Sequence, residues 1–406
     1  MALPRGLRAL GHRDYRLFWF GQLVSRVGTW MQSVGQAWLV LELTNSPLRL
    51  GLISTLQFAP VLLFAFLGGV LSDRMSKRRL IIATQVAMML QAFALASLVA
   101  TGHIAYWHVA VLASIYGIAN SLDMPARQAY VVELTGKDDL MSAIALNSAV
   151  FNGARVVGPA LAGILIGQYG VTAAFFINGV SFLAVLAALL AMRTEGAPHA
   201  GARATVREEL VQGTRYALRT PTITLVLGLL FFVSLFVLNF NVVVPLIARD
   251  VLGQGAHGFG LLMAALGGGA VLGALGVASA GLSRPTATMV VAGAAVTSLG
   301  VLSLGFVRSF GVAAAVLLVT GMAQIVFTSS ANSTMQVSVP DGMRGRMMSF
   351  YVLVFVGVTP AGAFLVGVMA EHFGVSTACA VGGAAGLVSV ATVTLLWRSR
   401  GRRLRS

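Results

Sequence analysis

Long apolar runs alternate with short polar stretches along the whole chain. Twelve of these runs are long enough to cross about 30 Å of hydrocarbon as helices of roughly 20 residues each. The predicted spans are 15–42, 48–72, 79–101, 104–128, 139–168, 171–192, 222–248, 257–281, 286–307, 310–337, 347–371 and 375–397. The pattern therefore predicts an all-α polytopic membrane protein with twelve transmembrane helices.

Composition and charge agree with a membrane protein. Hydrophobic residues make up 57% of the 406 positions, charged residues only 10%, and the mean hydropathy is +0.85. A net charge of +15 would suit a nucleic-acid-binding protein, but here the bases punctuate the apolar runs and form no single basic face. With the N-terminus taken as cytoplasmic, 23 of the 28 Lys and Arg residues fall on the cytoplasmic side. This asymmetry predicts that both termini are cytoplasmic.

The longest polar stretch divides the chain into two halves of similar length. The expected parts are a cytoplasmic N-terminus (1–14), a six-helix bundle (15–192), a cytoplasmic central loop (193–221), a second six-helix bundle (222–397) and a basic tail (398–406). Within the central loop Arg203, Arg207, Arg215 and Arg219 recur near helical spacing. They predict either an amphipathic helix on the anionic membrane surface or a solvated tether.

The two halves resemble each other. Gly158-Pro159-Ala160 in the fifth span has a counterpart in Thr359-Pro360-Ala361 in the eleventh, and Tyr169-Gly170-Val171-Thr172 has one in Phe373-Gly374-Val375-Ser376. Such matches indicate a parallel duplication about an axis along the membrane normal, an arrangement that is common in transporters.

Polar side chains inside several spans fall on one side of the predicted helix, at about 100° per residue. Polar and ionisable groups at this depth are costly unless they face a cavity or one another. The stripes therefore predict a polar cavity. The candidate cavity residues are Gln22, Arg26, Thr29, Ser33, Gln36, Tyr116, Asn120, Asn152, Arg155, Asn241, Gln324, Thr328 and Asn332.

Three stretches carry a resemblance to a known family. Asp123-Met124-Pro125-Ala126-Arg127-Gln128, the run from Ala154 to Gly163 and the run from Val339 to Arg346 resemble the enterobactin-exporter branch of the major facilitator superfamily. This branch is similar to siderophore and multidrug exporters. The resemblance implies two six-helix bundles, alternating access, and a central cavity lined by helices one, four, seven and ten, which are the spans that carry four of the polar stripes.

The stretch from Gly69 to Arg79 reads as a short charged loop between two spans. Its spacing resembles the loop between helices two and three of the same superfamily, with Ser76 where the family usually has a glycine. We expect a latch between Asp73 and Arg127 at the cytoplasmic rim, or alternatively a basic anchor that only sets topology. The candidate gate residues are Gly69, Asp73, Arg74, Lys77, Arg78, Asp123 and Arg127.

Hardly any acid lies deep in a span, which narrows the choice of a proton-binding group. Asp123 is the best candidate, with Asp73 and Glu42 behind it; the alternative is that Asp123 forms a fixed structural ion pair. In the fifth span Arg155, Gly158, Pro159 and Gly163 resemble the antiporter motif of exporting facilitators, or they form a simple kink and packing seam.

Two basic residues inside the predicted spans indicate which kind of compound is transported. Arg26 and Arg155 have no acid obviously placed at mid-depth to pair with both. They predict a positive cavity that favours anionic or catechol-bearing compounds, with aromatic support from Trp30 and Tyr116.

No pattern in the sequence indicates an enzyme, a cofactor or a metal site. The single Cys379 excludes an intramolecular disulfide, and the glycine run Gly267-Gly268-Gly269 lacks the Gly-Lys-Ser/Thr of a phosphate loop. The predicted function is proton-coupled export of a small amphipathic compound across the inner membrane by a monomer, with no nucleic-acid partner. The alternatives are an uptake carrier, a flippase for a lipid-like substrate, or a receptor or scaffold of the same fold.

Overall fold

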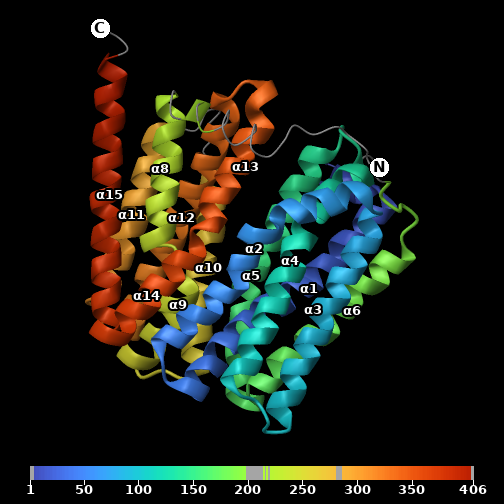
Figure 1. Ribbon diagram of the computed structural model, residues 1–406, viewed down its shortest axis with the longest axis horizontal. Coiled ribbons are helices and arrows are strands. Elements are labelled where there is room, and N and C mark those ends of the chain that lie inside the picture. The colour runs from blue at the N-terminus through green and yellow to red at the C-terminus, as the bar shows by residue number, and fades with distance from the viewer. Residues whose placement is uncertain (1–3, 198–213, 215, 218–219, 280–285, 404–406) are drawn as a thin grey trace. The chain divides into compact units, whose positions relative to one another are not determined.

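The computed structural model describes residues 4–197, 214, 216–217, 220–279 and 286–403. These residues are almost entirely helical, and they contain no strand. The first half comprises a 3-10 helix η1 (Arg5–Gly11) followed by six long helices (Figure 1). These are α1 (Arg13–Thr44), α2 (Pro47–Arg74), α3 (Lys77–Ala100), α4 (Tyr106–Thr135), α5 (Leu140–Tyr169) and α6 (Val171–Ala191).

The second half contains two spans that are broken into pieces. Its elements are α8 (Pro221–Phe236), α9 (Phe240–Leu246), a π-helical turn η2 (Ile247–Val251), α10 (Ala256–Ser279), α11 (Ala287–Leu304), α12 (Phe310–Ser338), α13 (Asp341–Gly357), α14 (Thr359–Phe373) and α15 (Val375–Arg403). Pro360 stands at the start of α14, where its missing N–H removes no helical hydrogen bond, so the eleventh run divides there. Between α8 and α9 the Asn239 side chain donates to the carbonyl of Leu235 at 2.9 Å and so satisfies backbone freed by the break.

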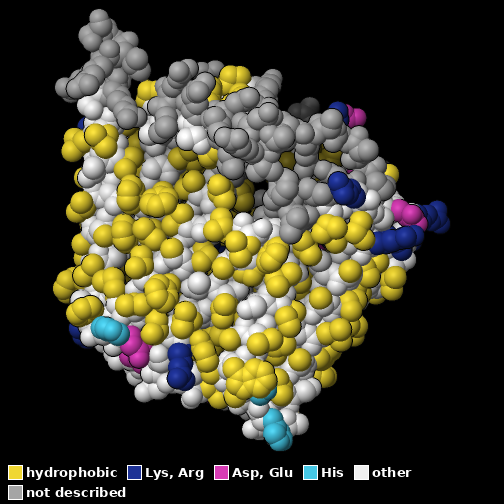
Figure 2. Space-filling view, in the orientation of Figure 1, with side chains coloured by type: hydrophobic (Ala, Val, Ile, Leu, Met, Phe, Trp, Pro, Cys, Tyr) yellow, Lys and Arg dark blue, Asp and Glu magenta, His cyan; other side chains and the backbone are white. Residues whose placement is uncertain are grey.

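Eleven segments of the described residues are long and apolar enough to cross a membrane. The eleven correspond to the second to twelfth predicted runs. The first run forms α1, which is 32 residues long but too polar to be counted among them. Figure 2 shows hydrophobic side chains over the middle of the helices on the face in view, and charged side chains near the helix ends. The predicted multi-pass helical fold is confirmed.

The chain folds into two compact units. Unit 1 comprises residues 1–46, 56–201 and 255–264, and unit 2 comprises residues 47–55, 202–254 and 265–406. Within unit 1, α6 packs against both α1 and α3, while α4 packs against α3 and α5 against α1. The buried core of these helices includes the aromatic residues Tyr15, Phe18, Tyr130 and Phe182.

Glycines set the closest helix contacts in both units. In unit 1 a Cβ on Gly158 would lie 2.5 Å from the Cβ of Trp30, so α5 sits directly against α1 at this point. In unit 2 a Cβ on Gly269 would overlap the carbonyl of Leu318 on α12, and one on Gly273 would lie 2.6 Å from the carbonyl of Met322. Glycines at such positions allow helix backbones to approach closely.

The charged loop between the second and third spans is shorter than expected. Helix α2 continues through Arg74 and α3 begins at Lys77, which leaves Met75 and Ser76 as the connection. The basic Arg74 suits the last turn of α2, where the helix dipole favours a positive charge. The Ser76 hydroxyl caps α3 by accepting from the Arg79 N–H. The amphipathic helix predicted over residues 203–219 falls almost wholly outside the described residues.

Candidate functional site

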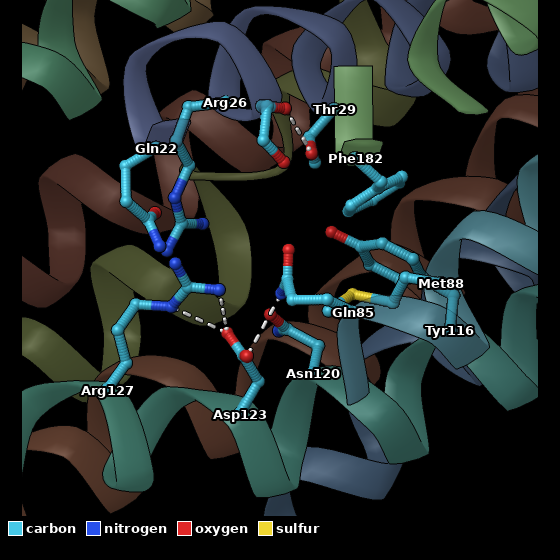
Figure 3. A pocket seen from close by; sticks show the side chains of 11 residues that line it. Gln22, Arg26, Thr29, Gln85, Met88, Tyr116, Asn120, Asp123, Arg127 and Phe182 are labelled. Carbon is cyan, nitrogen blue, oxygen red and sulfur yellow. Dashed lines mark hydrogen bonds and ion pairs between the residues drawn. The ribbon is translucent and has the colours of Figure 1, made fainter. Parts of the chain in front are cut away.

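A polar pocket lies among the helices of unit 1 (Figure 3). Helices α1 and α4 supply most of its lining, as the stripes predict, and α3 and α6 complete it. The lining residues are Gln22, Ser25, Arg26, Thr29, Gln85, Met88, Tyr116, Asn120, Asp123, Arg127 and Phe182. Seven of them are named from the sequence, whereas Ser25, Gln85, Met88 and Phe182 are not.

Asp123 lies at the centre of the pocket's polar contacts. Its side chain is only 2% exposed, and Arg127, one helical turn away on α4, binds its Oδ2 through both Nε, at 2.7 Å, and Nη2. Thr84 Oγ1 and Gln85 Nε2 on α3 donate to Oδ1 at 2.9 Å and 3.0 Å. The carboxylate therefore accepts four hydrogen bonds, two from a charged guanidinium and two from neutral polar donors.

The pair formed by Asp123 and Arg127 differs from the latch expected between Asp73 and Arg127. The carboxylate that binds Arg127 is that of Asp123, because a spacing of four residues places the two on one face of α4. The side chain of Asp73 lies outside the described residues. The Arg127 guanidinium also stacks 5.7 Å above the ring of Phe18, so it is held from two sides.

Arg26 is the second base of the pocket. It points inward from α1, near Gln22 and Arg127 (Figure 3), and makes no hydrogen bond or ion pair with any other described residue. Two buried polar atoms of neighbouring side chains, Gln22 Nε2 and Gln85 Oε1, likewise have no partner there. With one carboxylate and two guanidiniums, the described lining has a formal charge of +1.

Further along α1 a network of amides crosses unit 1. Gln32 donates to Gln91 on α3 at 2.8 Å and accepts from Asn178 on α6 at 2.6 Å. The Ser181 hydroxyl donates to Asn178 Oδ1 at 3.1 Å. This network is uncharged, and it holds α1, α3 and α6 in register.

Arg155 and its neighbours occupy a different surface from the pocket. The Arg155 guanidinium lies 5.9 Å above the ring of Trp30, and the Asn152 amide donates to the Ser148 carbonyl on its own helix. Ser33 and Gln36 lie beyond the pocket along α1, and Gln36 is buried. Arg155 is therefore not among the residues that line the pocket with Arg26.

The proton-binding alternative Glu42 and the predicted cavity residues of the second half are not among the residues that line this pocket. Glu42 accepts a hydrogen bond of 2.6 Å from Trp38 Nε1 near the C-terminal end of α1. In unit 2, Asn241 is on α9, and Gln324, Thr328 and Asn332 are on α12, each of them half-buried.

Residues 192–197, which we call the strap, run across one end of unit 1. The Asp14 carboxylate accepts from the Arg193 and Thr194 backbone N–H groups and from the Thr194 hydroxyl, at 2.8 to 2.9 Å. Burial alone would raise the pKa of Asp14, but these hydrogen bonds from Thr194 and Arg193 and the nearby Arg13 outweigh it and hold that pKa below its usual value.

Two of the predicted gate residues bind the strap. The Lys77 and Arg78 N–H groups donate to the carbonyls of Gly196 and Glu195, and Lys77 Nζ donates to Ala197 at 2.7 Å. Lys77 also forms an ion pair of 2.6 Å with Glu133 on α4. These bases therefore contact the start of the central connection, which sequence reasoning did not foresee. Arg74 is exposed at the end of α2.

No group of three or more His, Cys, Asp or Glu side chains placed to hold a metal ion occurs among the described residues. Chemically, the pocket offers an ion pair, an unneutralised guanidinium and several amides and hydroxyls, a set suited to binding a polar group.

Comparison with known proteins covers almost the whole chain. Residues 6–402 match the model of a family described as transmembrane secretion effector. The chain is 27% identical over 372 residues to the multidrug efflux pump Tap of Mycolicibacterium fortuitum, covering 88% of this chain and 89% of that protein. It is 22% identical to the staphyloferrin A transporter of Staphylococcus aureus, covering 96% and 97%, and 26% identical to the enterobactin exporter EntS of Citrobacter koseri, covering 97% and 94%.

Solved structures show the same fold at lower identity. A transporter of the POT family, in complex with a thioalcohol-conjugated peptide, superposes with a TM-score of 0.77 at 12% identity over 95% of this chain and 96% of that one. A bacterial homologue of the human lysosomal transporter Spinster, in an inward-facing and unoccupied conformation, gives a TM-score of 0.71 at 12% identity, covering 94% of each chain.

Proposed function

Because the chain belongs to the transmembrane secretion effector family of major facilitator transporters, we propose that it exports a small amphipathic compound by proton antiport. The family and the relatives are membrane transporters, not enzymes. The cargo class is a siderophore or a drug of anionic or catechol-bearing character. The transporter works by alternating access in the inner membrane as a monomer of two six-helix bundles, with both termini in the cytoplasm.

The buried pair of Asp123 and Arg127 is the observation that carries this proposal. Arg127, Thr84 and Gln85 together donate four hydrogen bonds to this carboxylate, so its environment depends on how α3 and α4 are placed. In the proposed cycle Asp123 takes up a proton when a conformational change moves these donors away. Proton binding would then release Arg127 for other contacts. Asp73 and Glu42 remain the second candidates for this role.

The other polar residues are assigned by position. Gln22, Arg26, Thr29, Tyr116 and Asn120 bind cargo from unit 1, and Asn241, Gln324, Thr328 and Asn332 do so from unit 2. Arg155 supports Trp30, while Gly158, Pro159 and Gly163 form the seam that limits leak. Gly69, Asp73, Arg74, Lys77 and Arg78 form the cytoplasmic gate.

Proteoliposomes test this proposal. We expect enterobactin, staphyloferrin A or ethidium to cause proton movement through the purified protein, recorded with a pH-sensitive dye inside the vesicles. Asp123→Asn should abolish transport driven by a pH gradient but keep exchange of labelled for unlabelled compound. Asp250→Asn removes an exposed carboxylate that pairs with Arg249 outside the pocket, and it serves as the matched control.

Two results would contradict the proposal. The first is wild-type protein that moves no protons with any of the three compounds. The second is an Asp123→Asn variant that still concentrates a compound against its gradient when only a pH gradient is supplied.

A further inference from the structure

The pocket of unit 1 contains unfilled hydrogen-bonding capacity of a defined kind. Gln22 Nε2 is a buried donor and Gln85 Oε1 a buried acceptor, and neither has a partner among the described residues. Gln22 is 6% exposed and Gln85 only 1%. Buried polar groups in native proteins are almost always paired with protein, water or ligand, so these two atoms mark where a bound polar group would complete the hydrogen bonding of the pocket.

The orientation of the Gln85 amide is fixed by its neighbour. Its Nε2 faces the Asp123 carboxylate, which can only accept, so Oε1 must point the other way. The pocket thus presents an acceptor at Gln85, on the opposite side of the amide from the ion pair.

The charge of the pocket is unbalanced at Arg26. The Asp123 carboxylate is fully used by Arg127, Thr84 and Gln85, and it offers Arg26 little. A guanidinium is always protonated and presents a planar fork of N–H donors that matches a carboxylate. Arg26 and the neighbouring Gln22 therefore form the donor side of a site for an anionic, planar group.

We propose that Arg26 and Gln22 bind a carboxylate of the cargo and that Gln85 Oε1 accepts from a hydroxyl adjacent to it. The substrate class is a hydroxycarboxylate, in which an anion and a hydroxyl donor stand side by side. Met88 and Phe182 are the apolar members of the lining and are nearly fully buried, so the carbon skeleton would pack against them once the pocket widens to admit it. This inference rests on the proposed function, whose binding pocket it makes specific.

Three small probe compounds separate the contributions of the carboxylate and of the hydroxyl to binding. 2-Hydroxybenzoate carries both groups, 2-hydroxybenzamide replaces the carboxylate by a neutral amide, and benzoate lacks the hydroxyl. Calorimetric titration of the purified wild-type protein near neutral pH should show 2-hydroxybenzoate binding about tenfold or more tightly than either of the others, because each loses a hydrogen bond to a buried partner.

Variants of Arg26 link the preference to the residue. Arg26→Gln should reduce the ratio between 2-hydroxybenzoate and 2-hydroxybenzamide to about one, and Arg26→Lys should retain part of it, since a lysine keeps the charge but not the fork. Arg16→Gln removes one positive charge from the exposed end of the same helix, and it should leave the ratio unchanged.

Equal binding of the three probes, or no binding of 2-hydroxybenzoate, by the wild-type protein would overturn the proposal. So would an unchanged ratio in Arg26→Gln. The titration uses no gradient, so its outcome is independent of proton coupling: selective binding with no proton movement would contradict the antiport mechanism and leave the subsite intact.

Discussion

At the residue scale, the pocket depends on the charge balance around Asp123. Its side chain is only 2% exposed, and its negative charge is compensated by Arg127. Removing one partner of such a pair strands the other charge away from water, whereas removing both does not. The pair therefore contributes to stability as a unit.

Single and double substitutions should differ in the size of the stability loss. Asp123→Asn leaves Arg127 without its counter-charge and should lower the free energy of unfolding by about 3 to 5 kcal/mol. The double variant Asp123→Asn with Arg127→Met should recover most of this loss. Thermal unfolding of the purified protein in detergent measures both, and a double variant less stable than the single one would contradict the idea.

The pocket residues show how much of the site could be predicted from the sequence. Gln22, Arg26, Asn120 and Asp123 repeat along α1 and α4 with helical periodicity, so the spacing alone assigns them to one face of each helix. Gln85 could not be assigned in this way, because Thr84, Gln85 and Gln91 are too few to form a polar stripe along α3, and only tertiary packing brings Gln85 to Asp123.

At the scale of elements, glycines decide how closely the helices of unit 2 approach. Within the run Gly267-Gly268-Gly269 on α10, neighbouring positions have opposite surroundings. A Cβ on Gly269 would overlap the backbone of Leu318 on α12, while one on Gly268 would meet nothing within 4 Å. The close contact is therefore confined to one side of α10.

This contrast provides a matched pair of variants. Gly269→Ala should force α10 and α12 apart and lower the unfolding temperature, because the obstructing atoms are backbone. Gly268→Ala should be neutral or stabilise the protein by about 0.5 to 1 kcal/mol, the ordinary gain from alanine in a helix. Equal unfolding temperatures for the two variants would show that the contact carries no energetic weight.

Helix breaks were harder to predict than helices. The run 222–248 reads as one span, yet the structure divides it between Phe236 and Phe240, where Asn239 rather than a proline supports the interruption. Hydropathy shows only that a segment is apolar. A single Asn side chain that hydrogen-bonds the freed backbone changes the hydropathy too little to reveal the break.

At the scale of the whole molecule, the proposed orientation can be tested through cysteine labelling. Cys379, the chain's single cysteine, is only 1% exposed, so Cys379→Ala gives a suitable background. His103 precedes α4 and Lys137 follows it, and both are exposed. Because α4 is 30 residues long, these two sites lie at opposite ends of one membrane-spanning helix.

A membrane-impermeant maleimide applied to intact cells should label His103→Cys and not Lys137→Cys. Opening the cells should expose Lys137→Cys to the reagent. The reverse pattern would place the termini outside and would also invert the direction of transport inferred here.

The unpaired charge of Arg26 has an electrical consequence. While Asp123 is ionised it neutralises Arg127, so the empty pocket carries a single positive charge, and a bound monoanion cancels it. When Asp123 takes up a proton for the return step, the empty pocket carries one further positive charge. A membrane potential acts on a moving charge with about 2.3 kcal/mol per 100 mV when the whole field is crossed. In an exporter of this kind, an inside-negative voltage would therefore draw the emptied site back toward the cytoplasm and leave the step that carries cargo outward almost unaffected.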